Sequence, residues 1–247
     1  SPVWPDERDS APDGCGWRQA WPTLAGMKTD TVAVPATALK ADTFGRILLM
    51  QGADGPYVRR DLEAGPYWLR PVARALARRE ARALAALDGL PATPRLLGFD
   101  GRRLDRSFMA GAAMFQAPPH GDLAYFRQAR RLLQQLHRRG MAHNDLAKEA
   151  NWLVRADGSP GIIDFQLAVL GPPRSRWMRL LAREDLRHLL KHKRTYCPQA
   201  ITPVERRVLK RRSWVRQLWF ATGKPVYRFV TRKLLRWRDN EGRGPRQ

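Results

Sequence analysis

Cysteine, long apolar runs and acidic residues are all scarce in this chain of 247 residues. Its two cysteines, Cys15 and Cys197, cannot form the disulfide framework of a small secreted domain, so a reducing compartment is expected. No apolar run approaches the roughly 18–20 residues that a membrane-spanning helix needs. The N-terminal residues include acids and prolines where a signal peptide has a basic and then an apolar stretch. These absences predict a cytoplasmic protein.

The shortage of acids gives 45 Lys and Arg against 23 Asp and Glu, and the imbalance is uneven. Residues 1–170 carry 23 basic and 18 acidic groups, a net charge of +5, whereas residues 171–247 carry 22 and 5, a net charge of +17. Such a charge indicates an anionic partner, namely nucleic acid, a membrane surface or a phosphorylated substrate. The alternative is a genome that favours arginine codons.

Two acids, an amide and a lysine stand close together in the middle of the chain. They are Asp145, Lys148, Asn151 and Asp164, and His143 precedes them. Carboxylate and amide oxygens hold Mg²⁺ on nucleotide phosphates, and one further acid orients the hydroxyl that receives the phosphoryl group. The segment therefore predicts phosphoryl transfer.

The spacing within this segment predicts a hairpin. Asn151 and Asp164 are 13 positions apart, which accommodates a strand over 152–155, a turn over 156–160 and a return strand over 161–163. The turn contains Asp-Gly and Pro-Gly pairs, which are strong turn signals. Asn151 and Asp164 should therefore lie side by side at one end of the hairpin.

In this segment the chain resembles the protein-kinase-like superfamily, whose catalytic loop reads H-x-D-x-x-x-x-N and is followed by D-F-G. It is most similar to RIO-type atypical kinases and lipopolysaccharide core-sugar kinases, over residues 36–200. The resemblance implies an α+β bilobal fold, with a small β-rich N-lobe containing one helix and a mainly helical C-lobe. It also implies ATP and Mg²⁺ as cofactors.

The resemblance also assigns roles. Asp145 is the catalytic acid, Asn151 and Asp164 are the Mg²⁺ ligands, and Lys148 neutralises the transferring phosphoryl group. His143 is expected to be a structural residue of the loop. The loop has one residue more between Asp145 and Asn151 than the family pattern, which leaves the metal pair intact.

The N-lobe should contribute nucleotide-binding residues. Gly45 is the only glycine in the segment 40–46, where a kinase has its glycine-rich loop, and an ordinary hairpin turn is the alternative. In the strand 57–61, Arg60 stands in for the usual lysine and is preferred to Arg59 because it shares a face with Val58. A helix over 71–88 places Glu80 among its apolar residues, where it should meet Arg60; a surface ion pair with a neighbouring arginine is the alternative. The apolar residues of that stripe are Val72, Leu76, Leu84 and Leu87.

Four segments are expected: an extension over 1–30, the N-lobe over 31–117, the C-lobe over 118–210 and a basic aromatic tail over 211–247. Residues 95–115 read as two or three strands that end at a connector over 116–121. This connector is expected to be the hinge, with adenine bound near residues 114–116. Asp122 should then cap a helix that buries Leu123, Phe126, Ala129, Leu133 and Leu136.

Some family features are missing. Gln166 replaces the glycine of D-F-G and Asn144 replaces a common arginine, while only 21 positions separate Asp164 from Asp185. That distance is too short for a regulated activation segment with a peptide-docking platform, so switching by loop phosphorylation is not expected. Asp185 is expected to hold the backbone of the catalytic loop.

The acceptor stays open at this stage. A protein Ser/Thr hydroxyl fits the resemblance to RIO kinases, whereas a core oligosaccharide fits the missing peptide platform and would place the protein peripherally on the inner membrane. The basic aromatic tail suits an anionic membrane, RNA, or packing on its own C-lobe. A pseudokinase that only binds nucleotide is a further alternative, and a nucleic-acid-binding protein is the weakest one.

Overall fold

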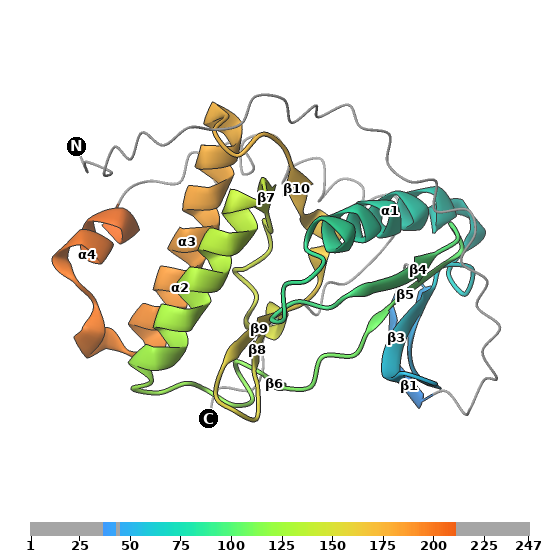
Figure 1. Ribbon diagram of the computed structural model, residues 1–247, viewed down its shortest axis with the longest axis horizontal. Helices are drawn as coiled ribbons and strands as arrows, with labels where there is room; N and C mark the ends of the chain where they lie inside the picture. The colour runs from blue at the N-terminus through green and yellow to red at the C-terminus, as the bar shows by residue number, and fades with distance from the viewer. Residues whose placement is uncertain (1–36, 43–44, 211–247) are drawn as a thin grey trace, which may run out of the picture.

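An antiparallel sheet of five strands forms the N-terminal lobe of the computed structural model, which describes residues 37–42 and 45–210. The strand order is β1-β2-β3-β5-β4. The hairpin between β2 and β3 turns at residues 52–55, Gly-Ala-Asp-Gly, which contain the turn-forming Asp-Gly pair. The strands are β1 (Thr37–Asp42), β2 (Gly45–Gly52), β3 (Gly55–Asp61), β4 (Leu96–Phe99) and β5 (Arg103–Ser107) (Figure 1).

Helix α1 (Arg70–Ala86) follows the short helix η1 (Tyr67–Leu69) and corresponds to the helix expected over 71–88. Its buried face differs from the prediction at the N-terminal end, because Val72 is 48% exposed and Leu76 is only half-buried. Ala73 and Ala77 face inward instead and pack with Leu62 and Phe99. Small side chains let the helix approach the sheet closely, so the buried face is lined by alanines and not by the larger apolar residues of the predicted stripe.

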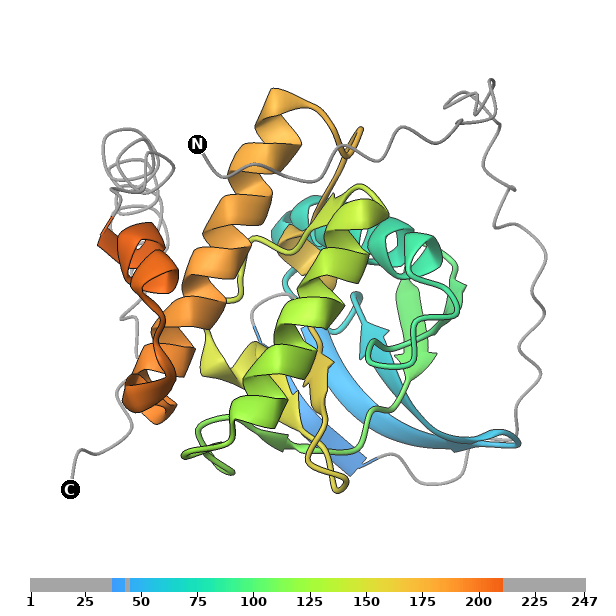
Figure 2. The same ribbon diagram turned by 60° about the vertical axis from the view of Figure 1, so that its left-hand side comes forward.

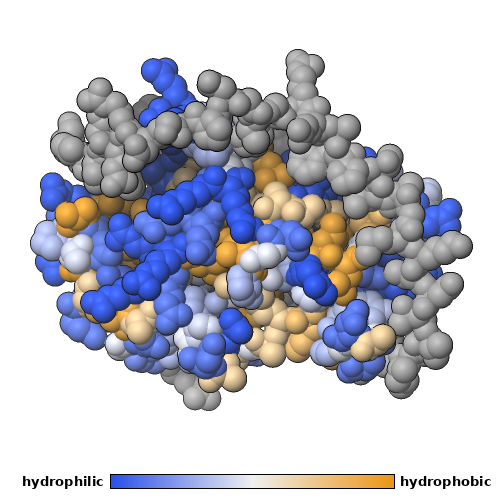
Figure 3. Space-filling view, viewed as in Figure 1, coloured by the Kyte–Doolittle hydropathy of each residue, from blue (hydrophilic) through white to orange (hydrophobic). Residues whose placement is uncertain are grey.

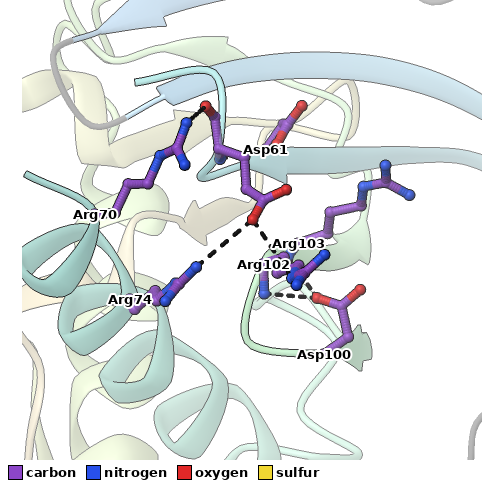
Figure 4. A network of polar contacts seen from close by, with 7 residues as sticks. Asp61, Arg70, Arg74, Asp100, Arg102 and Arg103 are labelled. Carbon is purple, nitrogen blue, oxygen red and sulfur yellow. Dashed lines mark hydrogen bonds and ion pairs between the residues drawn. The ribbon is translucent and has the colours of Figure 1, made fainter. Parts of the chain in front are cut away.

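Glu63 fixes the connection between β3 and α1 through three arginines. Its carbonyl oxygen accepts a hydrogen bond from Arg70 Nη2 at 2.9 Å. Its carboxylate Oε1 lies 3.6 Å from Arg74 Nη2 and 3.4 Å from Arg102 Nε. Figure 4 shows these arginines converging from α1 and from the turn before β5. The start of α1 is thereby tied to the sheet.

The C-terminal lobe is mainly helical. Figure 2 shows α2 and α3 side by side, with α4 on the outer side of α3. Asp122 Oδ1 accepts a hydrogen bond from Tyr125 N at 2.9 Å and so caps α2, as expected. The elements are α2 (Leu123–Arg138), α3 (Arg176–Tyr196), η4 (Pro198–Ala200) and α4 (Pro203–Lys210).

Helix α2 is strongly amphipathic. The face expected to be buried is buried, except that Leu123 is half-buried. On the face of the molecule seen in Figure 3, hydrophilic side chains gather over α2 in the left half of the view. The exposed residues of α2 include Arg127, Arg130 and Arg131. The apolar side of α2 therefore belongs to the core, together with Trp152, Phe165 and Met141.

Two small sheets carry the loops between the helices. The first has the order β6-β8-β9 and the second pairs β7 with β10. The hairpin expected after Asn151 is present, with strands at Trp152–Val154 and Pro160–Ile162. The remaining elements are β6 (Ala112–Ala113), β7 (Met141–Ala142), η2 (Glu149–Asn151), β8 (Trp152–Val154), β9 (Pro160–Ile162), η3 (Phe165–Leu167) and β10 (Val169–Leu170).

The connector between the lobes lies earlier than residues 116–121, where the sequence placed it. The chain leaves the five-stranded sheet at Ser107, and β6 already pairs with β8 in the C-terminal lobe. Residues 108–111 therefore link the lobes. The backbone N–H of Met114, expected near adenine, donates to Trp152 O at 2.9 Å instead.

No helix within residues 37–42 and 45–210 is long and apolar enough to cross a membrane.

Candidate active site

The β8–β9 hairpin brings the ends of the catalytic segment together. Trp152 pairs with Ile162, and the next residue, Ile163, donates its N–H to Asn151 O at 3.1 Å. Asp164 follows directly. The juxtaposition of Asn151 and Asp164 expected from their spacing is therefore a consequence of strand pairing.

Asp145, Lys148 and Asn151 form one polar cluster. Asp145 Oδ2 lies 3.0 Å from Lys148 Nζ and accepts a hydrogen bond from Asn151 Nδ2 at 3.1 Å. The same Nδ2 donates to Asp145 O at 2.9 Å. Because the nitrogen of the Asn151 amide is committed to Asp145, its oxygen is the atom suited to a cation.

Asp164 has the features of a metal ligand. Its backbone is left-handed, with φ 68° and ψ 71°, a conformation that few residues other than glycine adopt. Its Oδ1 is buried and makes no hydrogen bond within the described residues. A buried carboxylate oxygen without a partner is costly unless a cation meets it. The oxygens of Asp164 and Asn151 are the hard donors that Mg²⁺ prefers.

These two residues cannot form a complete metal cage alone. Within the part of the chain that the structure describes, no group of three or more His, Cys, Asp or Glu residues could hold a metal ion. Mg²⁺ at such a site takes its remaining ligands from phosphates and water. The donor set thus fits a metal that arrives with a nucleotide.

His143 is a structural part of the loop, as expected. It is fully buried, its Nε2 lies 3.0 Å from Ile163 O, and its Nδ1 accepts a hydrogen bond from Asp145 N at 3.3 Å. This pattern requires a neutral ring with the proton on Nε2. Burial lowers the pKa of His143, while Asp185 and the Ile163 carbonyl oppose the shift. The ring also packs against Phe165, with centroids 4.8 Å apart.

Asp185 on α3 holds the backbone that leads into the loop. Its Oδ2 accepts from His143 N at 2.8 Å, and its Oδ1 accepts from Asn144 N at 3.0 Å. His137 on α2 also reaches Oδ2, at 3.2 Å. One buried carboxylate therefore joins α2, α3 and the catalytic loop, as the sequence predicted.

Glu80 meets two arginines from the N-terminal sheet. The pairing with Arg60 expected from the sequence is present, with Arg60 Nη1 3.7 Å from Glu80 Oε2. Arg106 on β5 is closer, with Nη1 2.9 Å from Oε1. Burial raises the pKa of Glu80, and both arginines oppose that shift. The preference for Arg60 over Arg59 also agrees with the geometry, because Arg59 turns the other way and pairs with Asp105 at 2.7 Å.

Arg106 is the residue that the sequence did not identify. It shares a face with Arg60 because β3 and β5 pair with Val58 opposite Arg106 and Arg60 opposite Leu104. That register is a long-range property. The local signal was only a second arginine in an expected strand.

A model of the phosphotransferase enzyme family matches residues 28–205, most of the chain. The chain belongs to this family. No curated protein matches it at the level of sequence. The enzyme class agrees with the prediction made from the catalytic segment.

Solved structures show that this phosphotransferase has a protein-kinase-like fold. The Rio2 kinase from Chaetomium thermophilum matches with a TM-score of 0.55 and 16% identity, over 71% of this chain and 62% of that chain. The Rio2 kinase–ADP/Mg²⁺–phosphoaspartate complex from the same organism matches with a TM-score of 0.55 and 17% identity, over 84% and 69%. The chain thus spans less than two thirds of the first structure. The expected α+β bilobal fold is confirmed.

In this phosphotransferase Gly45 begins β2, directly after residues 43–44. Its φ is +137°, and a Cβ atom there would overlap the carbonyl oxygen of Asp61. The glycine is therefore required by the close approach of two backbones. The basic aromatic tail over 211–247 lies outside the described residues.

Proposed function

We propose that the chain transfers the γ-phosphoryl group of ATP to a hydroxyl acceptor. The observation that carries the proposal is the cluster of Asp145, Lys148 and Asn151 beside Asp164, whose buried oxygen lacks a hydrogen-bond partner. This combination supplies an acid, a cation and two oxygen ligands at one place.

Each residue then has one role. Asn151 and Asp164 would hold Mg²⁺, which neutralises charge on the nucleotide phosphates when it is bound. Asp145 orients the acceptor hydroxyl and takes its proton as the new O–P bond forms and ADP leaves. Lys148, whose side chain is half-exposed, neutralises the transferring group.

The nucleotide would bind between the lobes. Arg60 is the expected cation for the phosphates, Glu80 orients it, and Gly45 begins β2 opposite Asp42 of β1. The link over 108–111 takes the place of the connector predicted at 116–121. The backbone N–H groups of Met109 and Ala110 make no hydrogen bond within the described chain, which suits recognition of adenine.

The acceptor that we propose is a protein serine or threonine hydroxyl, as in an atypical RIO-like kinase. One observation favours a core sugar as the second candidate. Only η3 and β10 lie between Asp164 and the start of α3 at Arg176, so the described chain offers no peptide-docking platform there. A sugar kinase of this kind would act at the inner membrane, with the basic tail as its contact.

The test is transfer of label from γ-labelled ATP in the presence of Mg²⁺, with wild type and Asp145→Asn compared. The acceptors are the protein itself, a generic basic protein and dephosphorylated core oligosaccharide. Loss of a general base costs about 10²–10⁴ in rate. Label that depends on Asp145 supports the proposal, and the labelled acceptor identifies the substrate class. ATP binding without transfer would leave a pseudokinase instead.

A further inference from the structure

The catalytic loop has one extra residue, and side chains of α3 hold the lengthened loop in place. Five residues separate Asp145 from Asn151, where the family pattern has four. A longer loop has more conformational freedom to lose before its side chains reach fixed positions. Here the loop ends in the single turn η2, where Asn151 N donates to Lys148 O at 3.2 Å.

Two side chains from the last turns of α3 hold this loop. Tyr196 Oη donates to Glu149 Oε2 at 2.7 Å. His192 Nδ1 lies 3.7 Å from Glu149 Oε1, while its Nε2 lies 2.9 Å from Leu146 O. The loop is therefore attached to α3 at two points, one before Lys148 and one after it.

The protonation states suit these contacts. Burial raises the pKa of Tyr196 to about 12, and the hydrogen bond to Glu149 adds to the shift, so the phenol stays a donor at neutral pH. Burial lowers the pKa of His192, which favours a neutral ring that donates from Nε2 to Leu146 O. Both oxygens of Glu149 face α3, so this residue is not placed to bind metal.

We infer that Glu149, held by the Tyr196 hydroxyl, is a positioning residue that fixes Lys148 and Asn151 against Asp145. Glu149 directly follows Lys148 and is separated from Asn151 by one residue. Both Lys148 and Asn151 contact Asp145 Oδ2. Release of Glu149 would free the turn that orients both. The consequence for catalysis rests on the proposed function, whereas the anchoring itself does not.

The experiment compares Glu149→Ala, Glu149→Gln and Tyr196→Phe with Thr195→Ala. Thr195 is the exposed neighbour of Tyr196 on α3, and its hydroxyl donates a hydrogen bond to Lys191 O within its own helix. The first measurement is amide hydrogen exchange over residues 144–151 in the ligand-free protein. The second is the ratio of ADP dissociation constants without and with Mg²⁺.

We expect Glu149→Ala to speed exchange over 144–151 about tenfold, with unchanged exchange in α2. The gain in ADP affinity from Mg²⁺ should fall about tenfold, since loss of a group that orients a ligand commonly has that effect. Tyr196→Phe should change both measurements in the same direction but less. Glu149→Gln retains an oxygen for the Tyr196 hydroxyl and should stay close to wild type, as should Thr195→Ala.

The two measurements separate two kinds of failure. If Glu149→Ala and Tyr196→Phe exchange like Thr195→Ala, the anchoring role is wrong. If the exchange changes but the Mg²⁺ effect on ADP affinity does not, the positioning of Asn151 is wrong. If wild type itself shows no Mg²⁺-dependent binding of ADP, the proposed function fails, while the exchange data still test the anchor.

Discussion

Arg106 Nη1 lies 2.9 Å from Glu80 Oε1, nearer than Arg60, whose Nη1 is 3.7 Å from Oε2. The carboxylate is almost completely buried, at 1% exposure, so its charge depends on these two neighbours. Arg106 comes from β5 and Arg60 from β3. Glu80 therefore connects α1 to two strands of the sheet.

Substitution of Arg106 should destabilise the N-terminal lobe. Arg106→Met removes the closer partner of a buried carboxylate, and we expect the free energy of unfolding to fall by about 3 kcal/mol. Urea unfolding measures the change. Arg103→Met, an exposed position on the same strand, should stay within about 0.5 kcal/mol of wild type. Equal effects of the two substitutions would contradict a special role for Arg106.

Asp164→Asn should separate ligand binding from stability. Asparagine tolerates the left-handed backbone, and the change removes a negative charge whose Oδ1 is buried without a hydrogen-bond partner in the described residues, so the ligand-free protein should unfold at the same temperature or higher. Asp164→Ala, which lacks that tolerance, should unfold lower. Thermal unfolding with and without Mg²⁺ and ADP is the measurement. Stabilisation of Asp164→Asn by Mg²⁺ and ADP equal to that of wild type would refute the ligand assignment.

Acid should destabilise the fold through buried histidines. Burial lowers the pKa of His143, His188 and His192 below the ordinary value of 6.5. Below pH 6.5 these histidines are protonated in the unfolded chain but stay neutral in the folded chain. The free energy of unfolding therefore has its full value above this pH and decreases as the pH falls. Each group contributes a slope of at most about 1.4 kcal/mol per pH unit.

Urea unfolding between about pH 7.5 and about pH 5.5 tests this dependence. His143→Gln should show a smaller slope than wild type, because one of the three groups is gone. A wild-type free energy of unfolding that does not change over this interval would show that the histidines are not the cause.

Gly45→Ala should destabilise the protein through a clash with the backbone, and Gly55→Ala serves as the control without that clash. Gly45 and Gly55 both have positive φ, but only at Gly45 would a Cβ meet backbone, namely the carbonyl of Asp61. Gly55→Ala therefore suffers backbone strain alone, whereas Gly45→Ala adds a clash. We expect Gly45→Ala to lower the free energy of unfolding, measured with urea, by more than about 1 kcal/mol. The decrease should be larger than that caused by Gly55→Ala. Equal losses would mean that the contact with Asp61 is relieved by a small shift.

The sequence predicted the catalytic segment well because its geometry is local. The turn over 156–160 and the pairing of β8 with β9 follow from nearby residues, and they place Asn151 beside Asp164. The partner of Glu80 was predicted only in part, since the position of Arg106 depends on the register between β3 and β5. The connector was misplaced because residues 112–113 look like a strand of the first sheet but pair with β8. The face of α1 was misjudged because alanines, rather than larger residues, pack against Leu62.

The pairing of β7 with β10 has a consequence for motion during turnover. β7 leads into the catalytic loop, and β10 follows Asp164 and η3, so the strands that enter and leave the site belong to one ladder. Asp185 on α3 and the hydrogen bond from the Tyr125 hydroxyl on α2 to Leu153 O in β8 attach the same unit to the helices. The acid and the metal ligands should therefore move as one rigid body. Any movement that admits or releases the nucleotide is then expected to lie outside this unit.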